Sequence, residues 1–129
     1  MIDLDHFKQI NDTHGHMVGD EVLREISLRL AEVVRVYDKV GRFGGEEFVV
    51  VLPGTSQAEA EAAAERIREE LSRAPVDTTV GPLTVTASLG VVTRQGELAN
   101  DATTLLVAAD TALYSSKESG RDRVTVAFR

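Results

Sequence analysis

The segment RFGGEEFVVV, residues 42–51, constrains the fold more than any other stretch of this 129-residue chain. Two glycines stand directly before two glutamates, and the apolar run that follows is typical of a buried strand. A glycine pair permits a tight turn, with φ above zero, and lets another molecule approach the backbone closely. We therefore expect a hairpin whose second strand opens with adjacent carboxylates, Glu46 and Glu47, pointing to opposite sides.

Strand-like and helix-like apolar periods alternate along the rest of the chain. Met1 to Asp5 has the period of a strand, with Asp3 and Asp5 on one face. We expect a short helix or an irregular turn over residues 6–14. Longer helices are expected from an N-cap at Asp20 to about 34, from 57 to about 72, and from about 101 to a stop at Gly120. The other predicted elements are two short strands within 36–52, a loop over 74–81, a strand over 83–92, a loop over 94–100 and a last strand over 123–128.

This alternation predicts one domain, 1–129, of the α+β class, with a central sheet flanked by helices. The chain has no cysteine, which excludes disulfides and thiolate metal sites. A formal net charge of −7 argues against broad binding to DNA or RNA. No apolar run approaches the roughly 20 residues of a membrane span, and no signal peptide is apparent, so we expect a cytoplasmic protein.

Acidic side chains gather at two points that the fold can bring together. If the first strand neighbours the hairpin, Asp3 and one of the two glutamates converge. Two carboxylates within about 4 Å repel by roughly 1 kcal/mol even in water, and a divalent cation removes that repulsion. Mg²⁺ is typically bound through one or two carboxylates together with substrate phosphates. The alternative is that these are ordinary solvated acids at the end of a hairpin.

Four blocks resemble the GGDEF family, the diguanylate cyclases. GGEEF at 44–48 is similar to the family signature in its Glu variant, and DLDHFKQINDTHGHMVGDEVL at 3–23 resembles the nucleotide-binding segment. ASLGV at 87–91 and ADTALYSSKESGRDRV at 109–124 resemble a core strand and the closing helix and loop. The resemblance implies a ferredoxin-like palm, as in nucleotide cyclases, that condenses two GTP molecules into cyclic di-GMP within a homodimer.

The resemblance also implies roles for individual residues. Asp3, Glu46 and the Leu4 carbonyl match the ligands of Mg²⁺ or Mn²⁺, and Glu47 matches either a second metal ligand or the group that deprotonates the 3′-hydroxyl. Glu46 and Glu47 are thus the expected catalytic residues. The expected substrate contacts are Asn11 and Asp20 for guanine, the Phe7 and Lys8 amides with Lys117 and Arg121 for the triphosphate, and Gly45 against the nucleotide.

Simpler interpretations exist for several of these residues. Asp20 also suits a helix N-cap, Asn11 a turn, and Lys117 a favourable cation at the C-terminus of its helix. The histidines His6, His14 and His16 lack the spacing of a zinc site, and we expect structural roles for them.

RVYD at 35–38 resembles the family's RxxD product-inhibition motif at the spacing expected ahead of the glycine pair. Arg35 and Asp38 would then bind the guanine of cyclic di-GMP, and Arg66 would complete the site. The alternative is a surface ion pair of little energetic value.

The family domain usually begins earlier, with a helix and the leading half of the first strand. We therefore expect Asp3 to lie near a fraying chain end, which would weaken the GTP site and leave the RxxD site intact. An upstream sensory or receiver domain, usual in the family, is not part of this sequence. The alternative function is a catalytically silent module that senses cyclic di-GMP or GTP.

Overall fold

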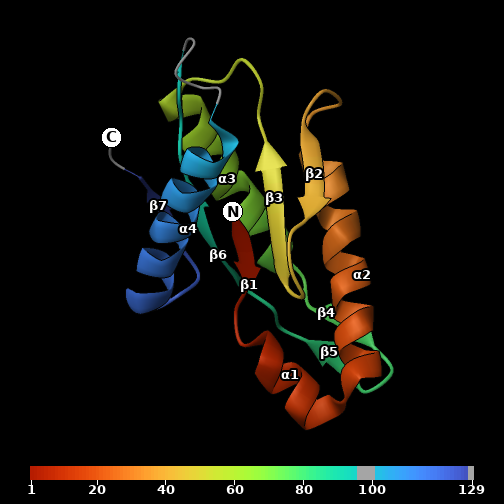
Figure 1. The fold of residues 1–129 in the computed structure, drawn as a ribbon. Helices are drawn as coiled ribbons and strands as arrows, with labels where there is room; N and C mark the ends of the chain where they lie inside the picture. The colour runs from red at the N-terminus through yellow and green to blue at the C-terminus, as the bar shows by residue number, and fades with distance from the viewer. Residues whose placement is uncertain (96–100, 128–129) are drawn as a thin grey trace.

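The computed structural model describes residues 1–95 and 101–127, and its framework is a five-stranded mixed sheet with helices on both faces (Figure 1). The α+β class predicted from the sequence is confirmed. Parts of the predicted loop over 94–100 and of the strand over 123–128 lie outside the described residues. Within the described residues, no helix combines the length and the apolar character needed to span a membrane.

β1, a strand of three residues, occupies the centre of the sheet, whose order is β2-β3-β1-β6-β7. β1 runs antiparallel to both of its neighbours, whereas β6 and β7 are parallel. The strands are β1 (Ile2–Leu4), β2 (Lys39–Arg42), β3 (Glu47–Val51), β6 (Ala87–Val91) and β7 (Val124–Val126). The residues that follow β1 therefore emerge between the ends of β3 and β6.

Among the described residues, three helices cover the two faces of this sheet and a fourth lies at its end (Figure 1). α2 (His16–Val33) and α3 (Gln57–Ser72) pack on one face, where Ile26, Leu30 and Leu71 are fully buried. α4 (Ala102–Glu118) covers the other face through Ala109 and Leu113. α1 (Phe7–His14) lies at the end of β1 and leads into α2.

Two predicted helix boundaries are confirmed and one is wrong. Ser56 and Glu59 form the expected capping box at the start of α3, and α4 ends at Glu118 with Ser119 as its C-cap, next to the predicted stop at Gly120. Asp20, however, is not an N-cap, because α2 begins at His16 with Gly15 as its cap. Gly15 has a φ of 91°, which breaks the helical path after α1 and allows α2 to start a full turn earlier than its apolar period suggests.

The region predicted as a loop over 74–81 instead contains a small hairpin. β4 (Val76–Thr78) pairs with β5 (Gly81–Leu83), and the predicted strand over 83–92 is correspondingly confined to β6. Gly81 has a φ of 102°, and the Thr78 hydroxyl donates to the Gly81 carbonyl at 2.6 Å. These turn contacts offset the small number of apolar residues, which is why the apolar period alone did not reveal the pair.

The chain start was expected to fray, but Met1 is tied to β6. Its amine donates to the Gly90 carbonyl at 3.0 Å, and the Gly90 amide donates back to Met1 at 2.9 Å. Burial lowers the pKa of the amine to about 6. A groove of about 790 Å³ lies next to Met1 and is lined by residues of β3, β6, α3 and α4.

α4 lies unusually close to β6 at Gly90. A Cβ at this position would lie 2.2 Å from the Ala109 carbonyl oxygen and 2.3 Å from the Leu113 amide nitrogen. Both are backbone atoms of α4, so neither can move aside without shifting the helix. The absent side chain therefore sets how closely α4 approaches the sheet.

Gly90→Ala should lower the free energy of unfolding by about 3 kcal/mol, because the added methyl forces α4 away from β6. Gly41→Ala is the matched control, since a Cβ at Gly41 on the exposed strand β2 meets nothing within 4 Å. The control should change stability by less than about 0.5 kcal/mol. Urea denaturation of both variants measures the difference, and equal stabilities would contradict the close packing.

Candidate active site

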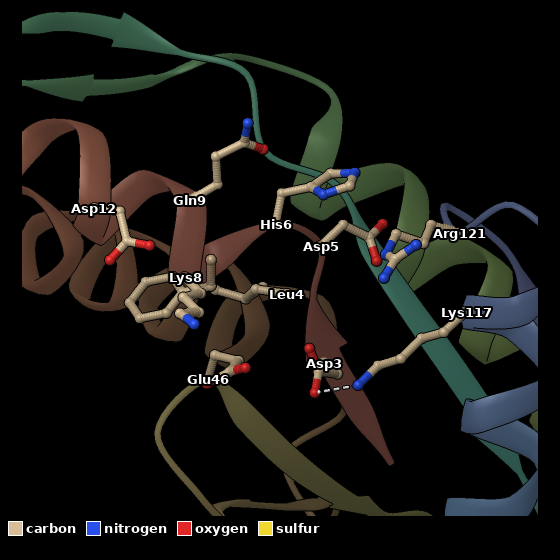
Figure 2. Close-up of a pocket in the computed structure, with 11 residues that line it drawn as sticks. Asp3, Leu4, Asp5, His6, Lys8, Gln9, Asp12, Glu46, Lys117 and Arg121 are labelled. Atoms are coloured by element: carbon tan, nitrogen blue, oxygen red, sulfur yellow. Dashed lines mark hydrogen bonds and ion pairs between the residues drawn. The ribbon is translucent and has the colours of Figure 1, made fainter.

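A cleft of about 400 Å³ opens where β1 ends and α1 begins (Figure 2). It is lined by elements far apart in the sequence: the β1–α1 connection, the start of β3 and the end of α4. Its lining residues are Asp3, Leu4, Asp5, His6, Phe7, Lys8, Gln9, Asp12, Glu46, Lys117 and Arg121. The structure thus brings together seven of the residues singled out from the sequence: Asp3, Leu4, Phe7, Lys8, Glu46, Lys117 and Arg121.

The carboxylates meet because of the register between β1 and β3. Asp3 is the direct antiparallel partner of Glu47, and the Leu4 amide donates to the Glu46 carbonyl at 3.2 Å. Directly paired residues project to the same face of a sheet. Burial raises the pKa of Glu47, and the charge of Asp3 raises it further. The register therefore concentrates negative charge at this end of the sheet.

Lys117 partly compensates this charge. Its ammonium group donates to a carboxylate oxygen of Asp3 at 2.8 Å, as the dashed line in Figure 2 marks. The Asp3 side chain is only 7% exposed, and burial raises its pKa even though the bond from Lys117 opposes that rise. Lys117 is thus more than a favourable helix-end cation, because it is the hydrogen-bonded partner of a buried acid.

The end of α4 places both cations at the cleft. The Gly120 amide bonds to the Lys117 carbonyl at 3.4 Å, and the Arg121 amide bonds to the Ser116 carbonyl at 3.0 Å. With Gly120 at a φ of 117°, these bonds form a Schellman motif. The motif turns the chain back by one helical turn, so that Arg121 lines the same cleft as Lys117.

The start of α1 faces the cleft from the other side. His6 precedes the helix with a φ of 57°, and no described side chain caps the first turn. The first amides of a helix have no partner within it, and they favour an anion at this position. The predicted use of the Phe7 and Lys8 amides is geometrically possible, because both residues line the cleft.

The remaining predicted substrate contacts lie outside the cleft lining. The Oδ1 atom of Asn11 is buried without a hydrogen-bond partner among the described residues. A Cβ at Gly19 would lie 1.9 Å from this atom, so Gly19 leaves room for the Asn11 side chain. Asp20 is exposed on α2, and Gly45 is exposed in the hairpin turn.

The glycine pair in the hairpin turn does not have the positive φ that the sequence suggested. Neither Gly44 nor Gly45 adopts a positive φ, so the left-handed conformation is not why they are glycines. A Cβ at Gly44 would lie 3.2 Å from a carboxylate oxygen of Glu47, whereas one at Gly45 meets nothing within 4 Å. The free space beside Gly45 remains compatible with a molecule lying against its backbone.

The donor set fits a divalent cation that is shared with phosphates. No group of three or more His, Asp or Glu side chains in the described part of the chain is arranged to hold a metal ion by itself. Asp3 and Glu46 nevertheless line one cleft. Mg²⁺ needs only one or two carboxylates when substrate oxygens complete its shell.

The RxxD residues form a cluster separate from the cleft, in the connection between α2 and β2. Asp38 accepts from the Arg35 guanidinium at 2.9 Å and from the Arg35 amide at 2.7 Å. Arg35 also donates to the Thr55 hydroxyl at 2.9 Å and stacks over the ring of Tyr37. Asp38 is only 8% exposed, whereas the Arg35 side chain is 38% exposed, so the ion pair has one buried and one exposed partner.

Electrostatics also link Arg66 to this cluster. Hydrogen bonds from Arg35 lower the pKa of Asp38, and the positive charge of Arg66 lowers it further. Arg66 lies on the exposed side of α3, as a residue that completes a surface site requires. Arg35 and Arg66 therefore both act on the Asp38 carboxylate.

The sequence interpretation missed four residues of the cleft lining: Asp5, His6, Gln9 and Asp12. Asp5 shares the strand face of Asp3, which was the available signal for it. His6 was assigned a structural role, yet its exposed side chain borders the cleft. Gln9 and Asp12 carried no signal, because their positions depend on how α1 is placed against β1.

The fold and the cleft define an α+β domain with paired carboxylates and paired cations facing one space. A family model described as "Diguanylate cyclase, GGDEF domain" matches residues 1–123. This chain belongs to the GGDEF family.

Known relatives agree with this assignment. The chain is 50% identical over 126 residues to "Response regulator PleD" of Caulobacter vibrioides, and the match covers 96% of this chain and 28% of that protein. It is 44% identical over 126 residues to "Diguanylate cyclase A" of Treponema denticola, covering 98% of this chain and 34% of the relative. The chain thus spans about a third or less of these curated relatives.

Solved structures are similar over nearly the whole chain. The GGDEF domain of DgcB from Caulobacter crescentus, in complex with c-di-GMP, has a TM-score of 0.89 at 34% identity, covering 97% of this chain and 74% of that one. The active GGEEF domain of a diguanylate cyclase from Vibrio cholerae has a TM-score of 0.87 at 34% identity, with coverages of 99% and 80%.

Lys117→Met should lower the free energy of unfolding by about 1–3 kcal/mol near pH 7, because it leaves the Asp3 carboxylate buried without its hydrogen-bonded cation. A raised pKa means that the folded state binds more protons than the unfolded state between the ordinary and the raised value. Stability therefore falls as pH rises through that window, and the deficit of Lys117→Met should shrink near pH 4.

Urea denaturation at both pH values measures this effect. Adding Asp3→Asn to Lys117→Met should restore stability, since a neutral amide is less costly to bury. Arg73→Met removes a pair with Glu70 whose side chains are 75% and 37% exposed, and serves as the control, with a change under about 0.5 kcal/mol. A deficit that is independent of pH and of Asp3 would disprove the pairing.

Proposed function

We propose that this domain condenses two GTP molecules into cyclic di-GMP and releases diphosphate. The observation that supports it most strongly is the composition of the cleft, where Asp3 and Glu46 face the same space as Lys117 and Arg121. Carboxylates suit a metal ion, and cations suit phosphates. The relatives whose names state diguanylate cyclase activity support the same conclusion.

The cations and the first turn of α1 would bind the triphosphate. Lys117 is 31% exposed in its side chain, so it can reach a phosphate oxygen once another cation compensates Asp3. Arg121 and the amides of Phe7 and Lys8 border the same space. Mg²⁺ or Mn²⁺, held by Asp3, Glu46 and the Leu4 carbonyl, would neutralise charge on the triphosphate during the displacement.

Asn11, Asp20 and Gly45 would contact the rest of the nucleotide. A carboxylate accepts from the N1–H and N2–H₂ edge of guanine, and an amide can donate to guanine N3 or O6. Adenine would leave the carboxylate without donors, which discriminates against ATP. The unpartnered Oδ1 of Asn11 is an acceptor that a bound base could satisfy.

Glu47 would act on the 3′-hydroxyl that attacks. Its pKa is raised by burial and by Asp3, which favours proton uptake nearer neutral pH. Its alternative role is as a second metal ligand. In a homodimer, each 3′-oxygen forms a bond to the α-phosphorus of the other GTP while the bond to diphosphate breaks, and the proton passes to Glu47 or solvent.

The cluster of Arg35, Asp38 and Arg66 would bind the product and inhibit synthesis. Arg35 would donate to a guanine edge or a phosphate, and Asp38 would accept from guanine N1–H and N2–H₂. The DgcB domain was solved in complex with c-di-GMP, which shows that a structurally similar domain binds this ligand. An upstream sensory or receiver domain would control how two copies meet.

A catalytically silent sensor is the second candidate. Two observations favour it: Lys117 already pairs with Asp3, and the Arg35–Asp38 cluster is preformed and partly buried. Such a module would bind cyclic di-GMP or GTP without turnover.

Incubation with GTP and Mg²⁺, followed by chromatography, should yield cyclic di-GMP, and a chelator should abolish its formation. Glu47→Gln should lower the rate by about 100-fold or more while GTP binding is retained. Glu70→Gln, in the half-exposed pair with Arg73 at the end of α3, is the control and should leave the rate unchanged. Cyclic di-GMP binding without turnover would support the sensor, and the absence of both would overturn both functions.

Arg35→Ala should weaken cyclic di-GMP binding by about tenfold or more, because charge-assisted hydrogen bonds are lost. GTP binding should be unchanged, since Arg35 does not line the cleft. Isothermal titration with each nucleotide measures both, with Arg73→Ala as the control. Equal loss of both ligands would argue against a separate inhibitory site.

A further inference from the structure

Asp5 is a buried acid to which neither the proposed metal site nor the proposed nucleotide contacts assign a role. It is 5% exposed and lies directly after β1. One carboxylate oxygen accepts from the Ser88 hydroxyl at 2.6 Å, and the other accepts from the Thr86 hydroxyl at 2.7 Å and from the Asp122 amide at 3.0 Å. The last bond joins the end of β1 to the turn that follows α4.

That turn has an unfavourable backbone. Gly120, Arg121 and Asp122 follow one another with φ values of 117°, 64° and 46°. Only glycine adopts the left-handed region without steric cost, so two consecutive non-glycine residues persist there only when their surroundings hold them. Arg121, one of these two residues, is also the one that lines the cleft.

A second element, α3, also holds this turn, through the side chain of Asp122. Arg68, on α3, donates to the Asp122 carboxylate at 2.8 Å. Arg68 is itself oriented by Glu65, which accepts two hydrogen bonds from it at 3.0 Å and 3.1 Å. Asp122 is therefore fixed by its backbone through Asp5 and by its side chain through Arg68.

We propose that Asp5 and Arg68 are positioning residues that hold the turn at 120–122 in its left-handed conformation, so that Arg121 is presented to a phosphate in the cleft. Figure 2 shows Arg121 and Asp5 on the same side of the cleft, with Lys117 reaching in beside them. Neither positioning residue needs to touch the substrate. The identity of the ligand as a triphosphate rests on the proposed function.

The chemistry of Asp5 distinguishes two substitutions. Asp5→Ala removes the acceptor of the Asp122 amide. Asp5→Asn keeps one carbonyl oxygen for that amide, and the Ser88 hydroxyl can rotate to accept from the new NH₂ group. The conservative variant should therefore preserve the turn, whereas the alanine variant should release it.

Binding of GTP with Mg²⁺, of inorganic triphosphate and of guanosine, measured by titration, tests the proposal. Asp5→Ala and Arg68→Met should each weaken binding of the two phosphate ligands by about tenfold, the value of one charge-assisted hydrogen bond. Guanosine binding should be unchanged, because Arg121 is placed to contact phosphate only. Asp5→Asn should remain within about threefold of the wild type.

A double-mutant cycle separates positioning from general damage. In an Arg121→Ala background, Asp5→Ala and Arg68→Met should cause no further loss of triphosphate binding, because their effect passes through Arg121. Arg73→Met, also at the end of α3 but in an exposed pair, is the control and should bind as the wild type. Additive losses, or equal losses for guanosine, would overturn the proposal.

A measurement without ligand keeps this proposal distinct from the proposed function. The backbone NMR chemical shifts of Arg121 and Asp122 report whether these residues are left-handed. They should lose the left-handed signature in Asp5→Ala and Arg68→Met, and should keep it in Asp5→Asn. Arg68→Met changes only a partly exposed side chain of α3. This variant therefore still tests the positioning role if Asp5→Ala fails to fold. If the wild type binds no triphosphate, the proposed function fails, and unchanged shifts in both variants would overturn the positioning role independently.

Discussion

Two buried carboxylates at the end of the central strand constrain the rest of this fold. A buried charge is strongly unfavourable unless it is paired or hydrogen-bonded. Asp3 is paired with Lys117, and Asp5 accepts hydrogen bonds from Thr86, Ser88 and the Asp122 amide. All of these partners lie near β6 or the end of α4. Both elements must therefore come to β1 before its acids can be tolerated, and the cleft lies where they meet.

The close approach of α4 makes this arrangement possible. Gly90 allows the backbone of α4 to lie against β6, and the Schellman motif after Lys117 then returns the chain toward the end of β1. A bulkier residue at position 90 would move both cations away from the acids. Packing in the apolar layer and charge compensation in the cleft are thus coupled through the position of α4.

Much of the fold could be predicted because its signals are local. The capping box at Ser56, the stop at Gly120 and the apolar periods of the strands report the conformation of nearby residues. The failures have equally local causes. Gly15 moved the start of α2 away from Asp20, and the β4–β5 hairpin is held by turn contacts rather than by apolar alternation.

The family, the class of fold and the kinds of groups available for chemistry could be read from the chain alone, since each depends on residue identity and on order along the chain. Which of those groups meet depends on how the elements pack in three dimensions. The Asp3–Lys117 bond joins residues 114 positions apart, and the cross-strand pairing of Asp3 with Glu47 depends on the register of β1 and β3. The support of Arg121 by Asp5 and Arg68 likewise joins three separate elements. Such pairings follow from packing and desolvation, which depend on distances that the order of residues does not specify.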